Sequence, residues 1–558
     1  MFKKIKTSPH YKWIALSNTT LAMLLASLNA TSLIIALPVI FRGIHINPLS
    51  AGSFSYLLWM LLGYMLVTAI FVVSLGRLGD MFGRVKMYNL GFIIFTLGAL
   101  GAALTWSHGG AGALEIIIFR MIQAIGGGLL MANSIAILTD AFPSNQRGLA
   151  LGINQIAVLA GSFLGVLVGG VLAQLSWRWV FLFNVPIGVI AIAWSYIGLK
   201  EIDHFHPTKI DWFGNLSFAL GLGMVLIGVT YGIRPYGHHT MGWESPLVLG
   251  LIFGGLIILG LFVLIEKKVK DPMFNLELFN IRAFTAGNIA SLLSSMSRGG
   301  LQFMLIMWLQ GIWLPLQGYA FTDTPLWAGI YLLPTTFGFL IAGPISGLLS
   351  DKYGARPFAT AGMILAAISF ALMMLLPVNF PYFLFAIILL INGIAFGLFS
   401  SPNTAGIMNS VPAEYRGVAS GMRATFMNIG QPLSIGIFFS LMIVGLTSSI
   451  PTTLYHGLVS NGIAPHLATN LSHLPAISYL FAAFLGYNPL KTLLGKNVLH
   501  KLPAHAAAHL TSKEYFPQLI GGPFKHGLTI VLAFAIGASL VAAAASWMRG
   551  GKYVHEES

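Results

Sequence analysis

Few side chains in this sequence could do chemistry, and those that could lie inside long apolar runs. Arg120 and Gln123 share one run with Glu115, and Arg298 lies in the middle of another. Arg120 lies roughly 12 Å inside its run at 1.5 Å per helical residue, so its guanidinium should face a watery cavity or a buried partner. Substrate binding and structural hydrogen bonding are both open for Arg120 and Arg298. Arg423 lies nearer the end of its run, where its side chain could extend to water.

Residue types that support other chemistries are absent or badly spaced. The chain has no Cys, which removes thiol nucleophiles, disulfides and thiolate metal sites. Six His between 447 and 524 follow no metal-ligand spacing, and the phosphate-binding pattern Gly-x-x-x-x-Gly-Lys-Ser/Thr does not occur. We therefore expect no catalytic residue, no metal and no cofactor, and we predict that the protein is not an enzyme.

The composition places these residues in a membrane. Of the 558 residues, 56% are hydrophobic and 8% are charged, and the mean hydropathy is +0.82. An ordinary soluble domain has about 25% charged residues. A soluble enzyme, a disordered chain and a nucleic-acid binder are therefore excluded. The net charge of +14 comes from Lys and Arg at the ends of apolar runs, where topology signals are expected.

A membrane-spanning helix needs roughly 20 apolar residues. The sequence contains fourteen such runs, at 13–40, 54–75, 87–107, 112–138, 149–174, 179–199, 213–233, 246–265, 283–315, 325–349, 357–377, 381–405, 417–446 and 525–548. Lys and Arg gather in alternate loops, whereas Arg42, Arg178 and Arg234 lie in short loops on the other side. The positive-inside rule then predicts a multi-pass protein of the plasma (inner) membrane with both termini cytoplasmic. Segment 447–524 would be a long extracellular loop.

Two motifs occur twice, with offsets of 271 and 269 residues. The pairs are Gly76-x-x-x-Asp80-x-x-Gly83 with Gly347-x-x-x-Asp351-x-x-Gly354, and Pro143-x-x-x-Arg147-Gly148 with Pro412-x-x-x-Arg416-Gly417. Such a repeat predicts two parallel six-helix halves, the arrangement of an alternating-access transporter. The halves would be residues 1–200 and 283–558, with two extra spans in the linker 201–282.

At these residues the sequence resembles the major facilitator superfamily, and within it the fourteen-span drug:proton antiporters of the QacA/EmrB type. The run from Gly76 to Lys86 resembles the superfamily's loop signature, and Arg120 to Gly126 resembles its motif in span four. The resemblance implies an all-α major facilitator fold. It also implies a cytoplasmic gating network that breaks when the halves rock, formed by Gly76, Asp80, Gly83 and Arg84 with Asp351 and Arg356.

Two further stretches carry the resemblance and also depart from it. Five glycines reproduce the spacing of the antiporter motif and should let helices pack closely: Gly152, Gly161, Gly165, Gly169 and Gly170. Val166 stands where that motif usually has Pro. In span one, Asn29 stands where the family usually has the Asp tied to proton coupling. Because Asn cannot titrate, that role does not carry over, and Glu115 remains as the carboxylate for any proton coupling.

The sequence thus predicts a monomeric exporter of amphipathic small molecules and drugs, surrounded by membrane lipids and without nucleic-acid partners. The resemblance implies coupling to protons. The alternative is a transporter of the same fold that moves an endogenous lipid or metabolite and is weakly coupled or uncoupled. A receptor or scaffold is a third class, supported by the long outer segment alone. Deep arginines without deep carboxylates favour neutral, zwitterionic or anionic substrates over compact cations.

Overall fold

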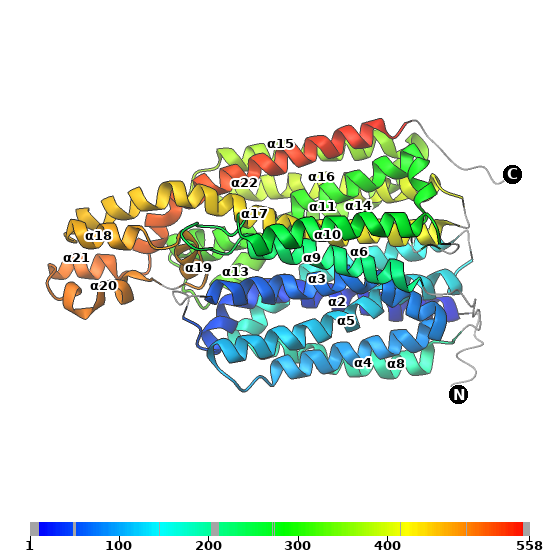
Figure 1. The fold of residues 1–558 in the computed structure, drawn as a ribbon, viewed down its shortest axis with the longest axis horizontal. Coiled ribbons are helices and arrows are strands. Elements are labelled where there is room, and N and C mark those ends of the chain that lie inside the picture. Colours follow the sequence, from blue (N-terminus) through cyan, green and yellow to red (C-terminus); the bar gives the residue numbers. More distant parts are fainter. Residues whose placement is uncertain are drawn as a thin grey trace.

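The structure is a computed structural model that describes residues 10–47, 52–143, 146–201, 211–269, 272, 274–412, 415–486 and 488–550. Within these residues, fourteen helical segments are long and apolar enough to cross a membrane, and they form one elongated bundle (Figure 1). The prediction of an all-α membrane protein with fourteen spans is confirmed.

The spans follow one another along the chain, and the longest connection between two of them is the one before the last span. The first six are α2 (Tyr11–Gly43), α3 (Ser53–Phe82), α4 (Arg84–Ala103), α5 (Gly109–Ala141), α6 (Arg147–Leu175) and the pair α7 (Trp179–Leu182) and α8 (Asn184–Gly198). The next two are α9 (Trp212–Gly232) and α10 (Pro246–Glu266), and the short η2 (Leu276–Asn280) precedes the last six. These are α11 (Arg282–Trp308) with η3 (Leu309–Trp313) and α12 (Leu314–Leu316), α13 (Thr324–Tyr331) with α14 (Leu333–Tyr353), α15 (Ala355–Leu375), α16 (Tyr382–Asn409), α17 (Arg416–Ser460) and α22 (Tyr515–Met548).

The sequence repeat is also a repeat of structure. Gly83 joins α3 to α4 at φ +106°, and Gly354 joins α14 to α15 at φ +85°, so both copies of the motif turn at a glycine that a side chain would strain. A Cβ on Gly161 would lie 2.5 Å from the Leu24 carbonyl oxygen, and one on Gly430 would lie 3.0 Å from that of Leu292. The first and fifth spans of each half therefore meet at corresponding glycines.

The segment expected as a long loop is largely helical. Helix α17 continues past Pro451 to Ser460, four short helices follow, and α22 begins at Tyr515, ten residues before the expected start of the last span. The short helices are α18 (Pro465–Ser472), α19 (Ala476–Phe484), α20 (Leu490–Leu499) and α21 (Ala504–Leu510). Helices α18, α20 and α21 protrude from one end of the bundle, the extension end, and red α22 finishes at the opposite end, the terminal end (Figure 1).

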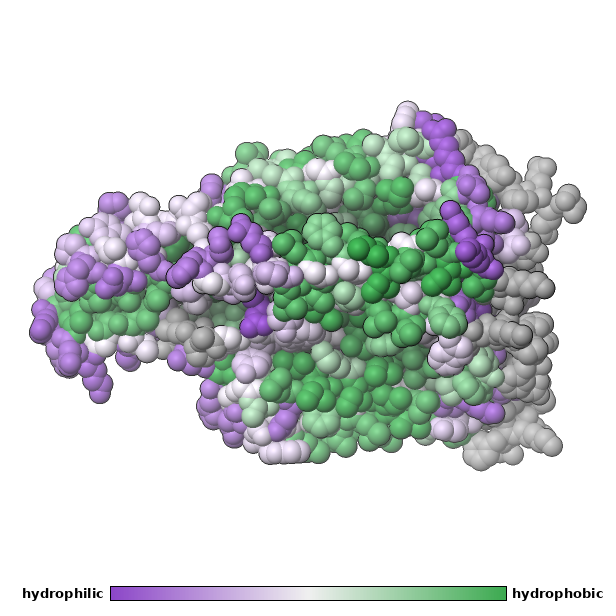
Figure 2. Space-filling view, viewed as in Figure 1, coloured by the Kyte–Doolittle hydropathy of each residue, from purple (hydrophilic) through white to green (hydrophobic). Residues whose placement is uncertain are grey.

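The outer surface matches a lipid bilayer. Large apolar side chains on the two extra spans are exposed, among them Phe213, Leu247, Phe253, Ile257 and Leu264. Figure 2 shows a broad hydrophobic band along the bundle, with hydrophilic surface on the extension and near the terminal end. Since lipid is as apolar as these side chains, their exposure costs nothing in a membrane.

Of the two extra helices, α9 packs on both halves of the repeat and α10 packs on α9. A Cβ on Gly223 of α9 would lie 3.4 Å from Ile70 of α3, and one on Gly436 of α17 would meet Val229 of α9. Two spans of the second half are broken: α11 passes into the π-turn η3, and Leu332 separates α13 from α14. Irregular turns within spans free backbone groups and often lie near functional sites.

Candidate functional site

Arg120 lies deep in the first half, on α5 eleven residues after the helix begins, or roughly 16 Å along it. Its side chain is 2% exposed. One guanidinium nitrogen donates to Asn29 Oδ1 on α2 and to Gln123 Oε1 at 3.1 Å, and the guanidinium carbon lies 4.5 Å from the centre of the Tyr64 ring on α3. The sequence-predicted residues Asn29, Arg120 and Gln123 therefore form one cluster that joins three helices.

Every described partner of Arg120 is neutral. Glu115 lies on the same helix, but its Oε1 accepts from the Ser107 hydroxyl, and no ion pair between Glu115 and Arg120 exists among the described residues. Arg120 Nε and Gln123 Nε2 are buried without a hydrogen-bond partner in the described part of the chain. The cluster is thus a buried cation stabilised by neutral dipoles and an aromatic face.

A cavity with an empty volume of about 520 Å³ lies in the second half between α11, α14, α16 and α17. Arg298 and Arg423 both line it, together with Ser291, Ser294, Ser295, Gly299, Phe339, Phe396, Phe399, Ser400, Asn403, Met427 and Gln431. The Arg298 guanidinium carbon lies 5.6 Å from the ring centres of both Phe339 and Phe396. Arg423, which the sequence places near the end of its span, is 8% exposed and lines this cavity.

A third arginine orients the polar wall of this cavity. Arg549, just beyond the end of α22, is buried and donates to Asn403 Oδ1, while Asn403 Nδ2 donates to Ser291 Oγ at 2.7 Å. Burial lowers the pKa of Arg549 to about 10, which leaves the guanidinium charged at neutral pH. Because an arginine can only donate, it fixes which way the Asn403 amide points and leaves the Ser291 hydroxyl hydrogen available.

A second cavity lies between the two halves, and its empty space, including the part open to the exterior, is about 820 Å³. Ser162, Phe163 and Val166 on α6 face Leu301, Leu305, Thr335 and Leu340 on α11 and α14 across it. It shares Arg298, Phe339 and Phe396 with the first cavity, and Asn392 also lines it. No residue that lines either cavity in the described part of the chain is acidic.

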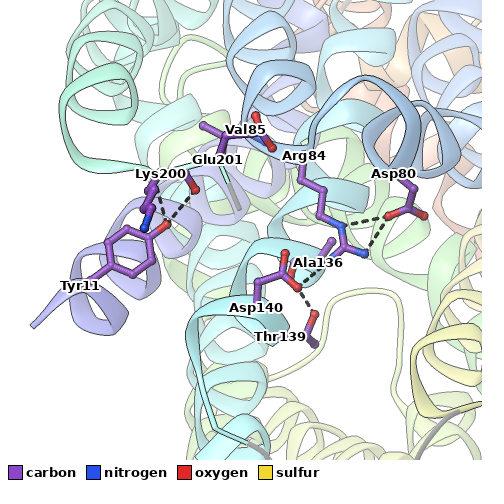
Figure 3. A network of polar contacts seen from close by, with 9 residues as sticks. All are labelled: Tyr11, Asp80, Arg84, Val85, Ala136, Thr139, Asp140, Lys200 and Glu201. Carbon is purple, nitrogen blue, oxygen red and sulfur yellow. Dashed lines mark hydrogen bonds and ion pairs between the residues drawn. The ribbon is translucent and has the colours of Figure 1, made fainter. Parts of the chain in front are cut away.

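The polar network at the loop signature lies within the first half (Figure 3). Arg84 bridges Asp80 at 2.8 Å and Asp140, on α5, at 2.6 Å. Glu201 accepts from the backbone nitrogens of Val85 and Lys86 and so caps the start of α4. Since all these residues except Glu201 belong to the predicted half 1–200, the expectation that this network must break when the halves rock is not supported by its contacts. It binds α3, α4 and α5 together.

The second copy of the signature is arranged differently. The side chain of Asp351 lies outside the described residues, while the Arg356 guanidinium carbon lies 3.8 Å from the centre of the Trp547 ring on α22. Gly76 makes an ordinary contact, with Ala132 3.4 Å from a Cβ placed on it. Thus Gly83, rather than Gly76, is the glycine that the turn of the first copy requires.

Four of the five predicted packing glycines pack against other helices. Gly161, Gly165 and Gly169 face the backbone of α2 at Leu24, Leu28 and Ser32, and Gly170 lies against Leu326 on α13. A Cβ on Gly152 would meet no described atom within 4 Å, so Gly152 shows no close contact among the described residues.

Sequence reasoning missed several residues of the site. Arg549 lies at a helix end, where a cation normally indicates topology, and Phe339 and Phe396 are ordinary apolar residues of a span. Arg298, which the sequence analysis did single out, lies 269 residues after Asn29, the offset of the internal repeat. Trp308 on α11 is 1% exposed, packs on Phe380 and lines neither cavity.

Known proteins are similar to this chain in sequence and in fold. A model of the Major Facilitator Superfamily matches residues 19–265 and 210–435. The riboflavin transporter RibZ of Clostridioides difficile is 31% identical, over 78% of this chain and 89% of its own length. The multidrug transporter protein MdtP of Bacillus subtilis is 26% identical, over 94% and 91%. A bacterial homologue of the human lysosomal transporter Spinster has the same fold, with a TM-score of 0.56 at 16% identity and 97% of each chain covered. The chain belongs to the major facilitator superfamily of membrane transporters.

Proposed function

We propose that this protein exports amphipathic small molecules by alternating access, with its terminal end in the cytoplasm. The observation that carries the proposal is the 820 Å³ cavity, because it is bounded by α6 of one half and by α11, α14 and α16 of the other. Its lining combines apolar side chains with a few polar groups, as in sites for small molecules. Relatives that are named multidrug transporters or resistance proteins support the same substrate class.

The proposed orientation in the membrane rests on the charge distribution. Lys267 and Lys268 follow α10 at the terminal end, and Arg77 and Arg84 lie in the hairpin between α3 and α4. By the positive-inside rule this end faces the cytoplasm. A cavity that opens alternately to the two ends would then take up substrate from the cytoplasm and release it outside. The gradient that drives transport would set this net direction, with one monomer as the working unit.

A second candidate substrate class is an aromatic metabolite. The 31% identical relative is named a riboflavin transporter, and Phe163, Phe339 and Phe396 in the cavity could pack against a planar ring system. This candidate keeps the fold and the mechanism and changes only what the cavity holds.

Transport by purified protein in proteoliposomes tests the proposal. We expect efflux of some members of a panel of amphipathic drugs, or of riboflavin, above the rate of protein-free vesicles. Val166→Trp would fill the wall of the cavity between the halves and should abolish that efflux, whereas Val171→Trp, on the exposed surface of α6, should not. No efflux of any panel member by folded protein would refute the proposal.

A further inference from the structure

The smaller cavity is lined by two cations and by no acidic residue among those that the structure describes. Arg298 and Arg423 line it, and in the described part of the chain neither makes an ion pair or a hydrogen bond. Arg423 Nε is fully buried without a hydrogen-bond partner. A buried guanidinium with unused donors is costly, so this arrangement would be stabilised by an anion that accepts from both side chains.

The other polar side chains at this cavity also act as hydrogen-bond donors. Arg549 donates to Asn403, Asn403 donates to Ser291, and the Ser291 hydroxyl is left to donate into the cavity. All members of this chain point their hydrogens in one direction, from the terminal end toward the cavity. Such alignment strengthens each hydrogen bond and favours an acceptor at the end of the chain.

The apolar side chains of the cavity determine what kind of molecule the anionic group can be attached to. Phe339, Phe396, Phe399 and Met427 form the rest of the lining, and the cavity continues through Arg298 into the larger one between the halves. An aromatic body could therefore extend from the arginines into the larger cavity. A small hydrated ion would leave these apolar side chains without contacts.

We infer that the Arg298–Arg423 cavity binds an oxyanion, a carboxylate or phosphate, attached to an aromatic or apolar body. The inference rests on the proposed function and narrows its substrate class, because the relatives' names specify no charge. It places the anion against Arg298, Arg423 and Ser291, and the body against Phe339 and Phe396 toward the larger cavity.

Binding to purified full-length protein tests the inference with probes that share a naphthalene ring and differ in the attached polar group, of which the carboxylate and the amide have nearly the same shape. Tritiated 1-naphthaleneacetate is bound to protein in nanodiscs of zwitterionic lipid and displaced by naphthaleneacetamide, naphthylmethyl-trimethylammonium or 1-naphthyl phosphate. Loss of a hydrogen-bonded charge pair costs about tenfold in affinity or more, so the amide should bind at least about tenfold more weakly than the carboxylate. The ammonium should not compete, and the phosphate shows which oxyanion is preferred.

Variants locate the site. Arg298→Gln and Arg423→Gln should each weaken carboxylate binding about tenfold and amide binding little, which removes the preference between them. Arg234→Gln, in the loop between α9 and α10, is the matched control and should keep the wild-type preference. Where a Gln variant fails to fold, Arg298→Lys retains the charge and should retain the preference in reduced form.

Equal affinity for carboxylate and amide, no binding of the carboxylate, or an unchanged preference in both Gln variants would overturn the inference. These results are separate from those of the transport assay. Efflux of neutral or cationic compounds without anion preference would leave the proposed function standing and reject the anion site. Anion binding without transport of any compound would support the anion site and reject the proposed function.

Discussion

Arg120 is a buried cation whose described hydrogen-bond partners are neutral, and this affects the free energy of burying its charge. Its guanidinium is held by Asn29, Gln123 and the Tyr64 ring, at a depth where a cation is expensive. Asn29 supplies one carbonyl oxygen and no charge. The cost of burying Arg120 is therefore only partly offset in this conformation.

Replacing Asn29 by Asp should stabilise the protein. The carboxylate would lie at hydrogen-bond distance from a cation that is already buried, so the gain should be about 1–3 kcal/mol in unfolding free energy, seen as a higher Tm in detergent. Asn29→Leu removes the oxygen and should lower the Tm. Shifts of both variants in the same direction would show that charge at this position is not what matters.

The residues of the site differ in how far sequence could predict them. Arg120, Asn29 and Gln123 were predictable because each is a polar residue in a long apolar run or lies in a recognised motif. Arg549 was not, because only the tertiary fold brings the end of α22 beside Asn403. The cap that Glu201 places on α4 was equally hidden, since it joins positions 116 residues apart.

At the scale of helices, the length of the apolar runs predicted the membrane spans but not the short helices between α17 and α22. In lipid, a segment must form its backbone hydrogen bonds internally, so a long apolar run is expected to form a helix. The helices α18 to α21 have only 7 to 10 residues, too few to cross a membrane, and apart from the apolar α19 each contains polar side chains. No sequence rule for single helices detects such an extension.

Packing between α2 and α6 gives a prediction at this scale. Gly161→Ala would place a Cβ 2.5 Å from the Leu24 carbonyl oxygen, so the two backbones must separate, at a cost of about 1–3 kcal/mol. Gly152→Ala, on the same helix, meets no described atom and should be neutral or stabilising by up to about 1 kcal/mol. Thermal unfolding of both variants measures the difference, and equal stability would contradict close packing at Gly161.

Helix α19 closes the extension end of the bundle. All of its nine residues except Ser478 are buried, and Phe481 lies 5.3 Å from Phe41 on α2 while Phe484 lies 5.6 Å from Phe303 on α11, measured between ring centres. It therefore fills the space between the first and second halves with apolar side chains. An opening of the cavity toward this end requires α19 to move.

A cross-link tests whether α19 must move. The chain has no native Cys, so Phe41→Cys with Phe481→Cys can be joined by a short bifunctional thiol reagent. We expect the linked protein to lose transport, and a cleavable reagent to restore it on reduction. The control pair Asn461→Cys and His509→Cys lies within the extension, 3.1 Å apart between side-chain atoms, and should leave transport intact when linked. Full transport with α2 and α19 linked would contradict the requirement.

At the scale of the whole molecule, the described contacts between the halves gather at the extension end. Gln310 of η3 donates to the Ile35 carbonyl on α2, Arg42 donates to that of Phe321, and Gly170 lies against Leu326. Together with α19 they close this end. The two cavities then lie behind the closure, lined by arginine and no acidic residue among the described ones.

This distribution of charge limits how protons could drive transport. Among the carboxylates within the described spans, Glu115 is bonded to Ser107, Asp80 and Asp140 pair with Arg84, and Glu266 accepts from the Phe274 backbone. His526 lies on α22 with an exposed side chain. None of these residues lines either cavity.

We expect proton coupling to be weak and to be abolished by Glu115→Gln. Uptake into vesicles with an imposed pH gradient measures it, and Glu277→Gln, exposed on η2, serves as the control. Strong gradient-driven accumulation that survives Glu115→Gln would mean that another group carries the proton.

A carrier of anions has another energy source in the membrane potential. One elementary charge that crosses a potential of 100 mV changes free energy by about 2.3 kcal/mol, equivalent to roughly fiftyfold accumulation on the positive side. A cell interior at negative potential would therefore expel the anions that Arg298 and Arg423 are proposed to bind, without any proton carrier. In proteoliposomes at equal pH on both sides, a potassium gradient with valinomycin should make labelled naphthaleneacetate gather on the positive side, whichever way the protein is inserted. Naphthaleneacetamide should stay evenly distributed, and Arg298→Gln should slow the approach to equilibrium. Accumulation that ignores the potential and follows a pH gradient instead would show that the anion moves together with a proton.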